Sequence, residues 1–281
     1  MVNNLWPMLK EAVSSYIEHD ALSRGAAIAF YAATALAPVL LILMAIVGLV
    51  LGEQAAREAL TYQFQELMGK QSAELVQSII KDAGRESTGA VATMIGAVML
   101  VVTASGVFGE MQTALNIIWQ ASPVGTPLSR LIRARAASLG LVASLGFLMV
   151  VSLAVSAALT ALGDYVNAVL PFGELILSVL TATVSFLLIG VLFAAIYKVL
   201  PDRNLEWRDV IAGAMITSFL FTVGKSLIGW YLGSSAVASA YGAAGALFIV
   251  LLWVFYTSQI FLLGAEFTHV YAKSRVAVGD A

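Results

Sequence analysis

Long, uninterrupted runs of apolar residues are the feature that most constrains how this chain can fold. A helix needs about 20 apolar residues to cross a hydrocarbon core roughly 30 Å thick, and lipid offers no partner to unpaired backbone groups. The runs that are long enough are 26–51, 89–108, 136–162, 175–200, 210–232 and 242–267. The sequence therefore predicts an all-α membrane protein in which six transmembrane helices form a single domain over residues 1–281.

The composition agrees with a surface that faces lipid. Hydrophobic residues make up 60% of the chain and charged residues only 11%, whereas about a quarter of a typical soluble domain is charged. The absence of cysteine excludes disulfides, thiolate metal sites and a cysteine nucleophile. A net charge of −2 gives no basic excess that would indicate a nucleic-acid partner. We expect no bound cofactor and no metal.

Lysine and arginine residues between the spans set the expected orientation, because cytoplasmic loops are enriched in them. With the N-terminus inside, ten of these residues fall on the cytoplasmic side and four fall outside, in the long connection 53–88. Lys225 lies within a span and is not counted. Both termini are therefore expected in the cytoplasm.

Two polar stretches outside the spans also show helical periodicity. Residues 1–24 carry apolar side chains at helix spacing from Leu5 to Ile17, which suits a helix lying on the cytoplasmic membrane interface. The connection 52–88 carries two apolar stripes separated by Gly69, which predicts an external helical hairpin. Its role stays open between a packing lid and a docking surface.

Polar residues on the fifth span define one half of a candidate substrate path. Ser218, Thr222 and Lys225 share a helix face, because steps of three and four return to the same side. Lys225 lies about six residues, or roughly 9 Å, from the outer end of its span. Its ammonium group either snorkels outward along its stem or lines a path for an anionic substrate.

The sixth span provides the other half of this path. Tyr256, Gln259 and Glu266 lie on one heptad-like face that points at a neighbouring helix or at the interior. If the fifth and sixth spans form a hairpin, Glu266 would lie level with Arg208. Charges inside membranes are usually paired, so a structural ion pair between Arg208 and Glu266 is favoured. The alternative is that Glu266 acts as a gate or as a proton- or cation-coupling group.

Backbone features of two spans add weaker indications. Pro38 removes one backbone hydrogen bond and predicts a kink near the middle of the first span. Broken helices often mark transport sites, although proline also occurs in membrane helices for packing reasons. Gly242 and Gly245, at the start of the sixth span, predict close approach to a neighbouring helix.

Four stretches carry motifs that recur in a known family. They are Gly25–Leu41 (GAAIAFYAATALAPVLL), Ala114–Trp119 (ALNIIW), Tyr197–Leu232 (with YKVLPDRNLEWRDVIAGA and GKSLIGWYL) and Tyr241–Glu266. The last has a YG opening, an LLW centre and an LLGAE ending and is the most specific. Together the four stretches resemble the YihY/BrkB family of bacterial inner-membrane proteins, in order along nearly the whole chain. The connection 53–88 and the third span carry little of the resemblance.

The resemblance implies a bundle of six membrane helices in the bacterial inner membrane. Members of the family have been labelled ribonuclease BN and linked to serum resistance, and their proposed roles include moving lipids or solutes. For this chain we expect a transporter or permeation path for an anionic lipid or a small solute. Membrane lipids are the expected partners, and a homo-oligomer is compatible with the sequence.

Two other functions are weighed against transport. A membrane scaffold would dock envelope partners through the external hairpin or the interfacial helix. A ribonuclease is disfavoured, because His19 and His269 are the only histidines and neither has metal-ligand spacing around it. Enzymatic activity is therefore not expected.

Overall fold

The computed structural model describes residues 5–68, 70–86, 106–121, 173–234 and 245–279, with isolated positions between 140 and 155. Within these residues every regular element is a helix, which confirms the all-helical prediction. The predicted spans 89–108 and 136–162 lie mostly outside the described residues, as does Gly242.

Four of the described helices are long and apolar enough to cross a membrane. They are α2 (Ala21–Leu51), α7 (Gly173–Val199), α8 (Trp207–Ser234) and α10 (Gly245–Gly279). Each covers all or most of a run that the sequence predicted as a span. The helices also extend past the apolar runs, and α10 continues a further three turns beyond the predicted end at residue 267, because its polar end has partners of its own.

The surface of these helices is apolar, as contact with lipid requires. Large side chains such as Val179 on α7, Phe219 on α8 and Trp230 on α8 are more than half exposed. A water-soluble monomer rarely leaves so much contiguous apolar surface uncovered. The exposed apolar faces of α7 and α8 therefore belong in the hydrocarbon core.

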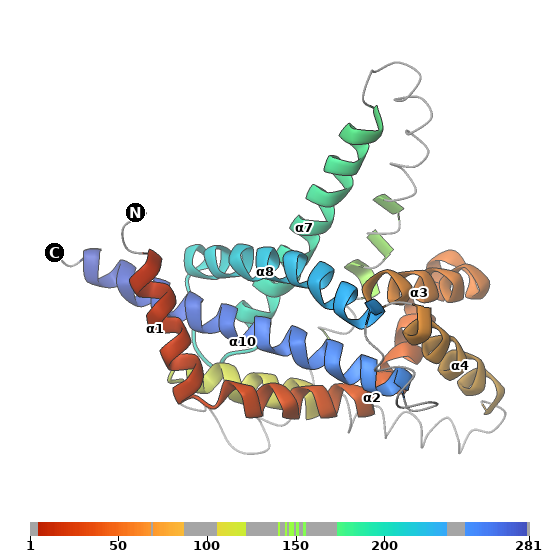
Figure 1. Ribbon diagram of the computed structural model, residues 1–281, viewed down its shortest axis with the longest axis horizontal. Helices are drawn as coiled ribbons and strands as arrows, with labels where there is room; N and C mark the ends of the chain where they lie inside the picture. Colours follow the sequence, from red (N-terminus) through yellow and green to blue (C-terminus); the bar gives the residue numbers. More distant parts are fainter. Residues whose placement is uncertain are drawn as a thin grey trace.

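The two termini lie at one end of the bundle and a helical hairpin lies at the other (Figure 1). The hairpin consists of α3 (Glu53–Met68) and α4 (Lys70–Glu86), so the helices predicted for 52–88 are present. At the opposite end, α1 (Leu5–Glu18) packs against α10 through Ala12 and Phe267. Pro38 lies inside α2, which runs as one helix through it.

Close packing of α8 against α10 depends on glycines that receive hydroxyl side chains from the facing helix. At each of three positions a Cβ atom would overlap the partner's hydroxyl oxygen, so only glycine fits at this separation. The pairs are Gly213 with Thr268, Gly264 with Thr217 and Gly224 with Tyr256. Because one number in each pair rises as the other falls, these contacts fix the antiparallel register of the two helices.

Tyr197 of α7 joins the third helix to this pair. Its side chain is fully buried, and its hydroxyl lies 3.0 Å from Oγ1 of Thr217 on α8. The same hydroxyl donates to the carbonyl oxygen of Phe261 on α10 at 2.7 Å. One phenol group thus ties α7, α8 and α10 together at the level where the candidate site begins.

Candidate functional site

Glu266 lies at the centre of the candidate site. Its side chain projects from α10 and is completely buried, with Oε1 2.7 Å from Nδ1 of His19. Its other oxygen, Oε2, has no hydrogen-bond partner among the described residues. Burying a carboxyl group with only one partner is costly, so its presence inside a span indicates a function.

The turn between α1 and α2 positions His19. Asp20 adopts the left-handed conformation, with φ 52° and ψ 39°, and this turn folds α1 back along α10. The His19 carbonyl accepts a 3.0 Å hydrogen bond from Nε of Arg24, in the first turns of α2. The Arg24 contact thus holds the His19 backbone, and the imidazole ring reaches from the end of α1 to the Glu266 carboxyl group.

A cavity of about 330 Å³, which we call the terminal cavity, lies between α1 and α10 beside this pair. Its volume falls in the range of small-molecule sites, roughly 300–1,000 Å³. Its lining residues are Glu11, Ser14, Ser15, Glu18, His19, Gln120, His269, Val270 and Lys273. His19 belongs to both the cavity wall and the buried pair, so it connects Glu266 with the cavity.

Both histidines of the chain line the terminal cavity, although they are 250 positions apart in sequence. His269 also packs against the ring of Trp119, with ring centroids 5.1 Å apart. In the part of the chain that the structure describes, no three His, Asp or Glu side chains are arranged to hold a metal ion. The terminal cavity thus brings together the imidazole groups of two distant parts of the chain.

Gln259 forms a second polar link between α10 and the N-terminal segment. Its side-chain oxygen accepts a hydrogen bond from the hydroxyl of Tyr16, and its amide nitrogen lies 3.5 Å from the carbonyl oxygen of Leu22. Gly25 of α2 lies so close to Gln259 that a Cβ atom on residue 25 would overlap the Gln259 side-chain amide. Burial raises the pKa of Tyr16, which keeps its hydroxyl a neutral donor.

The predicted seam along α10 divides between two neighbours. Gln259 and Glu266 contact the α1–α2 segment, whereas the Tyr256 hydroxyl packs on Gly224 of α8. Gly245 is buried at the start of α10. The glycines that permit close packing of α10 with α8 are Gly264, Gly213 and Gly224. The pattern of residues on α10 did not predict their role.

The structure also separates the polar residues of α8 from Glu266. The hydroxyls of Ser218 and Thr222 donate to carbonyl oxygens of their own helix, at 2.7 and 2.8 Å. Ser218 is buried, and a Cβ atom on Gly190 of α7 would lie 3.4 Å from its Oγ. Lys225 is half-buried, and the helix register places it about ten residues, or roughly 15 Å along the axis, from Glu266.

Arg208 and Glu266 do not form the ion pair predicted for them. The register set by the glycine contacts places Glu266 level with Met215, about two helical turns from Arg208, which is exposed. The ion pair between these helices joins Asp209 to Arg275, with Nε to Oδ1 at 3.0 Å and Nη2 to Oδ2 at 3.1 Å. Glu266 pairs with His19 instead.

A group of residues outside the spans supports the site, and no spacing pattern predicted it. Asn116 and Asp202 exchange two hydrogen bonds, at 2.8 and 2.9 Å, which fasten the helical segment 106–118 to the α7–α8 connection. Nη1 of Arg203 donates to the Trp119 carbonyl at 2.8 Å. These contacts hold the Trp119 ring against His269. Only the motifs ALNIIW and PDR, which carry the family resemblance, pointed to these positions.

Comparison with known proteins matches most of the chain to one family. A family model described as virulence factor BrkB matches residues 12–280. A UPF0761 membrane protein of Alkalilimnicola ehrlichii is 28% identical over 73% of this chain and 45% of its own length. The UPF0761 membrane protein YihY of Salmonella typhimurium is 30% identical over 65% of this chain and 60% of its own length.

A third relative, a UPF0761 membrane protein of Pasteurella multocida, is 31% identical over 63% of this chain and 54% of its own length. The chain thus spans about half the length of the curated relatives it matches. No solved structure matches the chain.

Proposed function

Because this chain belongs to the virulence factor BrkB family and is a multi-pass protein of the bacterial inner membrane, we propose that it forms a transport path for an anionic lipid or a small solute. The observation that carries the proposal is the Glu266 carboxyl group, buried within α10 with one oxygen paired to His19 and the other without a described partner. Ionisable groups inside spans typically mark substrate or ion paths.

The position of Glu266 next to the terminal cavity supports transport over a purely structural role. His19 contacts Glu266 on one side and lines the cavity on the other, so a proton or a substrate group entering the cavity reaches the carboxyl group through His19. A scaffold would gain nothing from a carboxyl group that is half satisfied inside the bundle. In this proposal Glu266 acts as a gate or as a proton-coupling group.

Movement of α1 would open the path. This helix is fastened to α10 by three polar contacts: His19 with Glu266, Tyr16 with Gln259, and Glu11 with Lys273 at 2.9 Å. Losing the first contact on substrate binding would release the helix from α10 close to the cavity. The remaining contacts lie on either side of it and would limit how far α1 moves.

Lys225 would act at the other end of the path. It lies on α8 a little over one turn before the exposed side chains of Trp230 and Tyr231. Tryptophan and tyrosine concentrate at membrane interfaces, so this lysine lies near the level of lipid head groups. There its ammonium group would attract an anionic head group or solute.

Purified protein in liposomes tests the proposal. We would measure the translocation of fluorescent phosphatidylglycerol and the uptake of labelled small anions by the parent protein and by Glu266→Gln. Glu206→Gln is the matched control, because Glu206 is a largely exposed acid at the same end of the bundle that pairs with Arg275 and does not line the terminal cavity. We expect Glu266→Gln to abolish a transport activity that Glu206→Gln retains. Equal activity of both variants would refute the role given to Glu266.

A further inference from the structure

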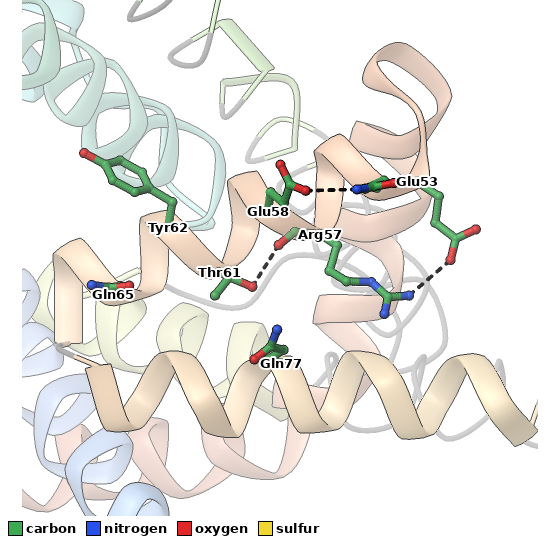
Figure 2. Close-up of a pocket in the computed structure, with 8 residues that line it drawn as sticks. Glu53, Arg57, Glu58, Thr61, Tyr62, Gln65 and Gln77 are labelled. Carbon is green, nitrogen blue, oxygen red and sulfur yellow. Dashed lines mark hydrogen bonds and ion pairs between the residues drawn. The ribbon is translucent and has the colours of Figure 1, made fainter.

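A second and larger cavity lies in the helical hairpin, at the end of the bundle opposite the termini. We call it the hairpin cavity; its volume is about 720 Å³, within the range of small-molecule sites. Every side chain that lines it is polar or is a tyrosine. They are Glu53, Gln54, Arg57, Glu58, Thr61, Tyr62, Gln65 and Gln77 (Figure 2).

Two of the three charged groups that line the hairpin cavity, Glu53 and Arg57, form an ion pair within α3, and the third, Glu58, is bonded to a neutral amide. Arg57 Nη2 lies 3.2 Å from Oε1 of Glu53, and Nε2 of Gln54 donates to Oε1 of Glu58 at 3.3 Å. The Thr61 hydroxyl donates to the Arg57 carbonyl at 2.8 Å. Glu58 leaves the lining with one net negative charge, which repels an anion, and the other lining side chains are uncharged. These groups suit a neutral ligand.

Other groups of the cavity remain available to a ligand. Within the described residues no hydrogen bond engages the side chains of Tyr62, Gln65 or Gln77. Figure 2 shows Gln77 rising from α4 toward α3, while Gln65 and Tyr62 project from α3 itself. Tyr62 is 60% exposed, so its ring presents a flat apolar face.

We propose that the hairpin cavity binds a neutral polyhydroxylated ligand, namely a sugar. A hydroxyl group both donates and accepts a hydrogen bond, and a carboxamide offers both functions in return. A tyrosine ring adds an apolar face against which the C–H groups of a sugar ring can pack. A peptide helix would instead need pockets for aliphatic or aromatic anchor side chains. Among the lining residues Tyr62 is the one aromatic, and none is aliphatic.

The hairpin is held firmly enough to keep such a site in shape. On the side away from the cavity, Leu60 of α3 and Val76 and Ile80 of α4 are buried against Leu40 of α2. The two helices that supply the amides are thus packed on a membrane span. The site is separate from Glu266 and the terminal cavity, so this proposal does not depend on the proposed transport function.

Saturation-transfer NMR on the full chain in nanodiscs tests the proposal, because this method detects weak ligands. The probe is free maltose, and a second arm uses nanodiscs that contain diglucosyl diacylglycerol as a lipid-borne competitor. The test variants are Gln65→Ala/Gln77→Ala and Tyr62→Ala. Ser78→Ala is the control, since Ser78 is the exposed neighbour of Gln77 and does not line the cavity.

We expect a maltose signal that weakens about tenfold in the double amide variant, as the loss of two hydrogen bonds of ordinary strength predicts. Tyr62→Ala should weaken it as well, and Ser78→Ala should leave it unchanged. Competition by the glycolipid would assign the site to a lipid-borne sugar, and its failure to compete would assign it to a free saccharide. The proposal is overturned if no sugar signal appears in either arm, if the signal survives the double variant, or if only a triglycine probe binds. Helix content by circular dichroism shows that each variant is folded.

Discussion

Nδ1 of His19 and Oε1 of Glu266 lie 2.7 Å apart although 247 positions separate these residues in the sequence. This contact joins the turn after α1 to the buried face of α10. The predicted pair between Arg208 and Glu266 fails for a separate reason, since the register of α8 on α10 places Arg208 about two helical turns from this carboxyl group. The arrangement leads to predictions for the pair itself and for the helices that position it.

The first prediction concerns the strength of the His19–Glu266 contact. Replacing His19 with alanine leaves a buried carboxyl group without its one described partner, which should cost about 1.5–3 kcal/mol of unfolding free energy. In Glu266→Gln the buried group is neutral, so a second change to His19→Ala should cost much less. Unfolding of the two single variants and the double variant in mixed micelles measures the coupling. Additive effects would mean that the two side chains do not interact.

A second prediction tests the packing of α8 on α10. Gly213→Ala would place a Cβ atom on the Thr268 hydroxyl, so we expect a loss of about 1–3 kcal/mol. Gly229→Ala is the control on the same helix, because nothing lies within 4 Å of its position. This control should be neutral or slightly stabilising, since alanine favours helix over glycine.

Restoring space on the facing helix separates a packing effect from a general defect in α8. Thr268→Ala removes the hydroxyl that the new Cβ atom would meet, and it should recover part of the stability lost in Gly213→Ala. The thermal unfolding midpoint of detergent-solubilised protein is the measurement. No recovery in the double variant would argue against the direct contact.

Residue patterns predicted the helices of this protein better than the contacts between them. The apolar runs that became α2, α7, α8 and α10 could be recognised because a membrane leaves a long apolar segment few alternatives to a helix. The register of α8 against α10 could not, because it depends on which glycine of one helix meets which hydroxyl of the other. The residue pattern of one helix does not show which residues of the neighbouring helix it contacts. The sequence therefore predicted Glu266 about two helical turns from its actual level on α8.

One half of the candidate site, the polar face of α10, could be identified from the sequence, whereas its partners could not. Gln259 and Glu266 were identified from their shared face on α10, and both do contact the N-terminal segment. Their partners, Tyr16 and His19, come from a helix that the sequence placed at the membrane interface without indicating which span it covers. Tertiary packing between segments so distant in sequence leaves no periodic signal.

A third prediction concerns the ion pair that does join α8 and α10. Arg275→Lys should lose the two parallel hydrogen bonds to Asp209, because a lysine ammonium is a single point charge. We expect only a small loss of stability, since the arginine side chain is partly exposed and solvent screens the pair. Arg208→Ala should change stability little, because Arg208 is exposed. If Arg208→Ala proved the more damaging change, the observed register of the helices would be in doubt.

The fourth prediction tests the orientation of the chain in the membrane, on which the sides assigned to the terminal cavity and to Lys225 depend. The chain has no cysteine, so a single introduced cysteine can be labelled without background. Ala55→Cys places an exposed thiol on α3 of the hairpin, and Ser14→Cys places one on α1 near the termini. With both termini inside, an impermeant maleimide should label Ala55→Cys in cells with a permeabilised outer membrane and should label Ser14→Cys only after lysis. The opposite labelling pattern would mean that the chain has the inverted orientation. The terminal cavity would then lie outside, and there would be no reason to place Lys225 at the level of the outer head groups.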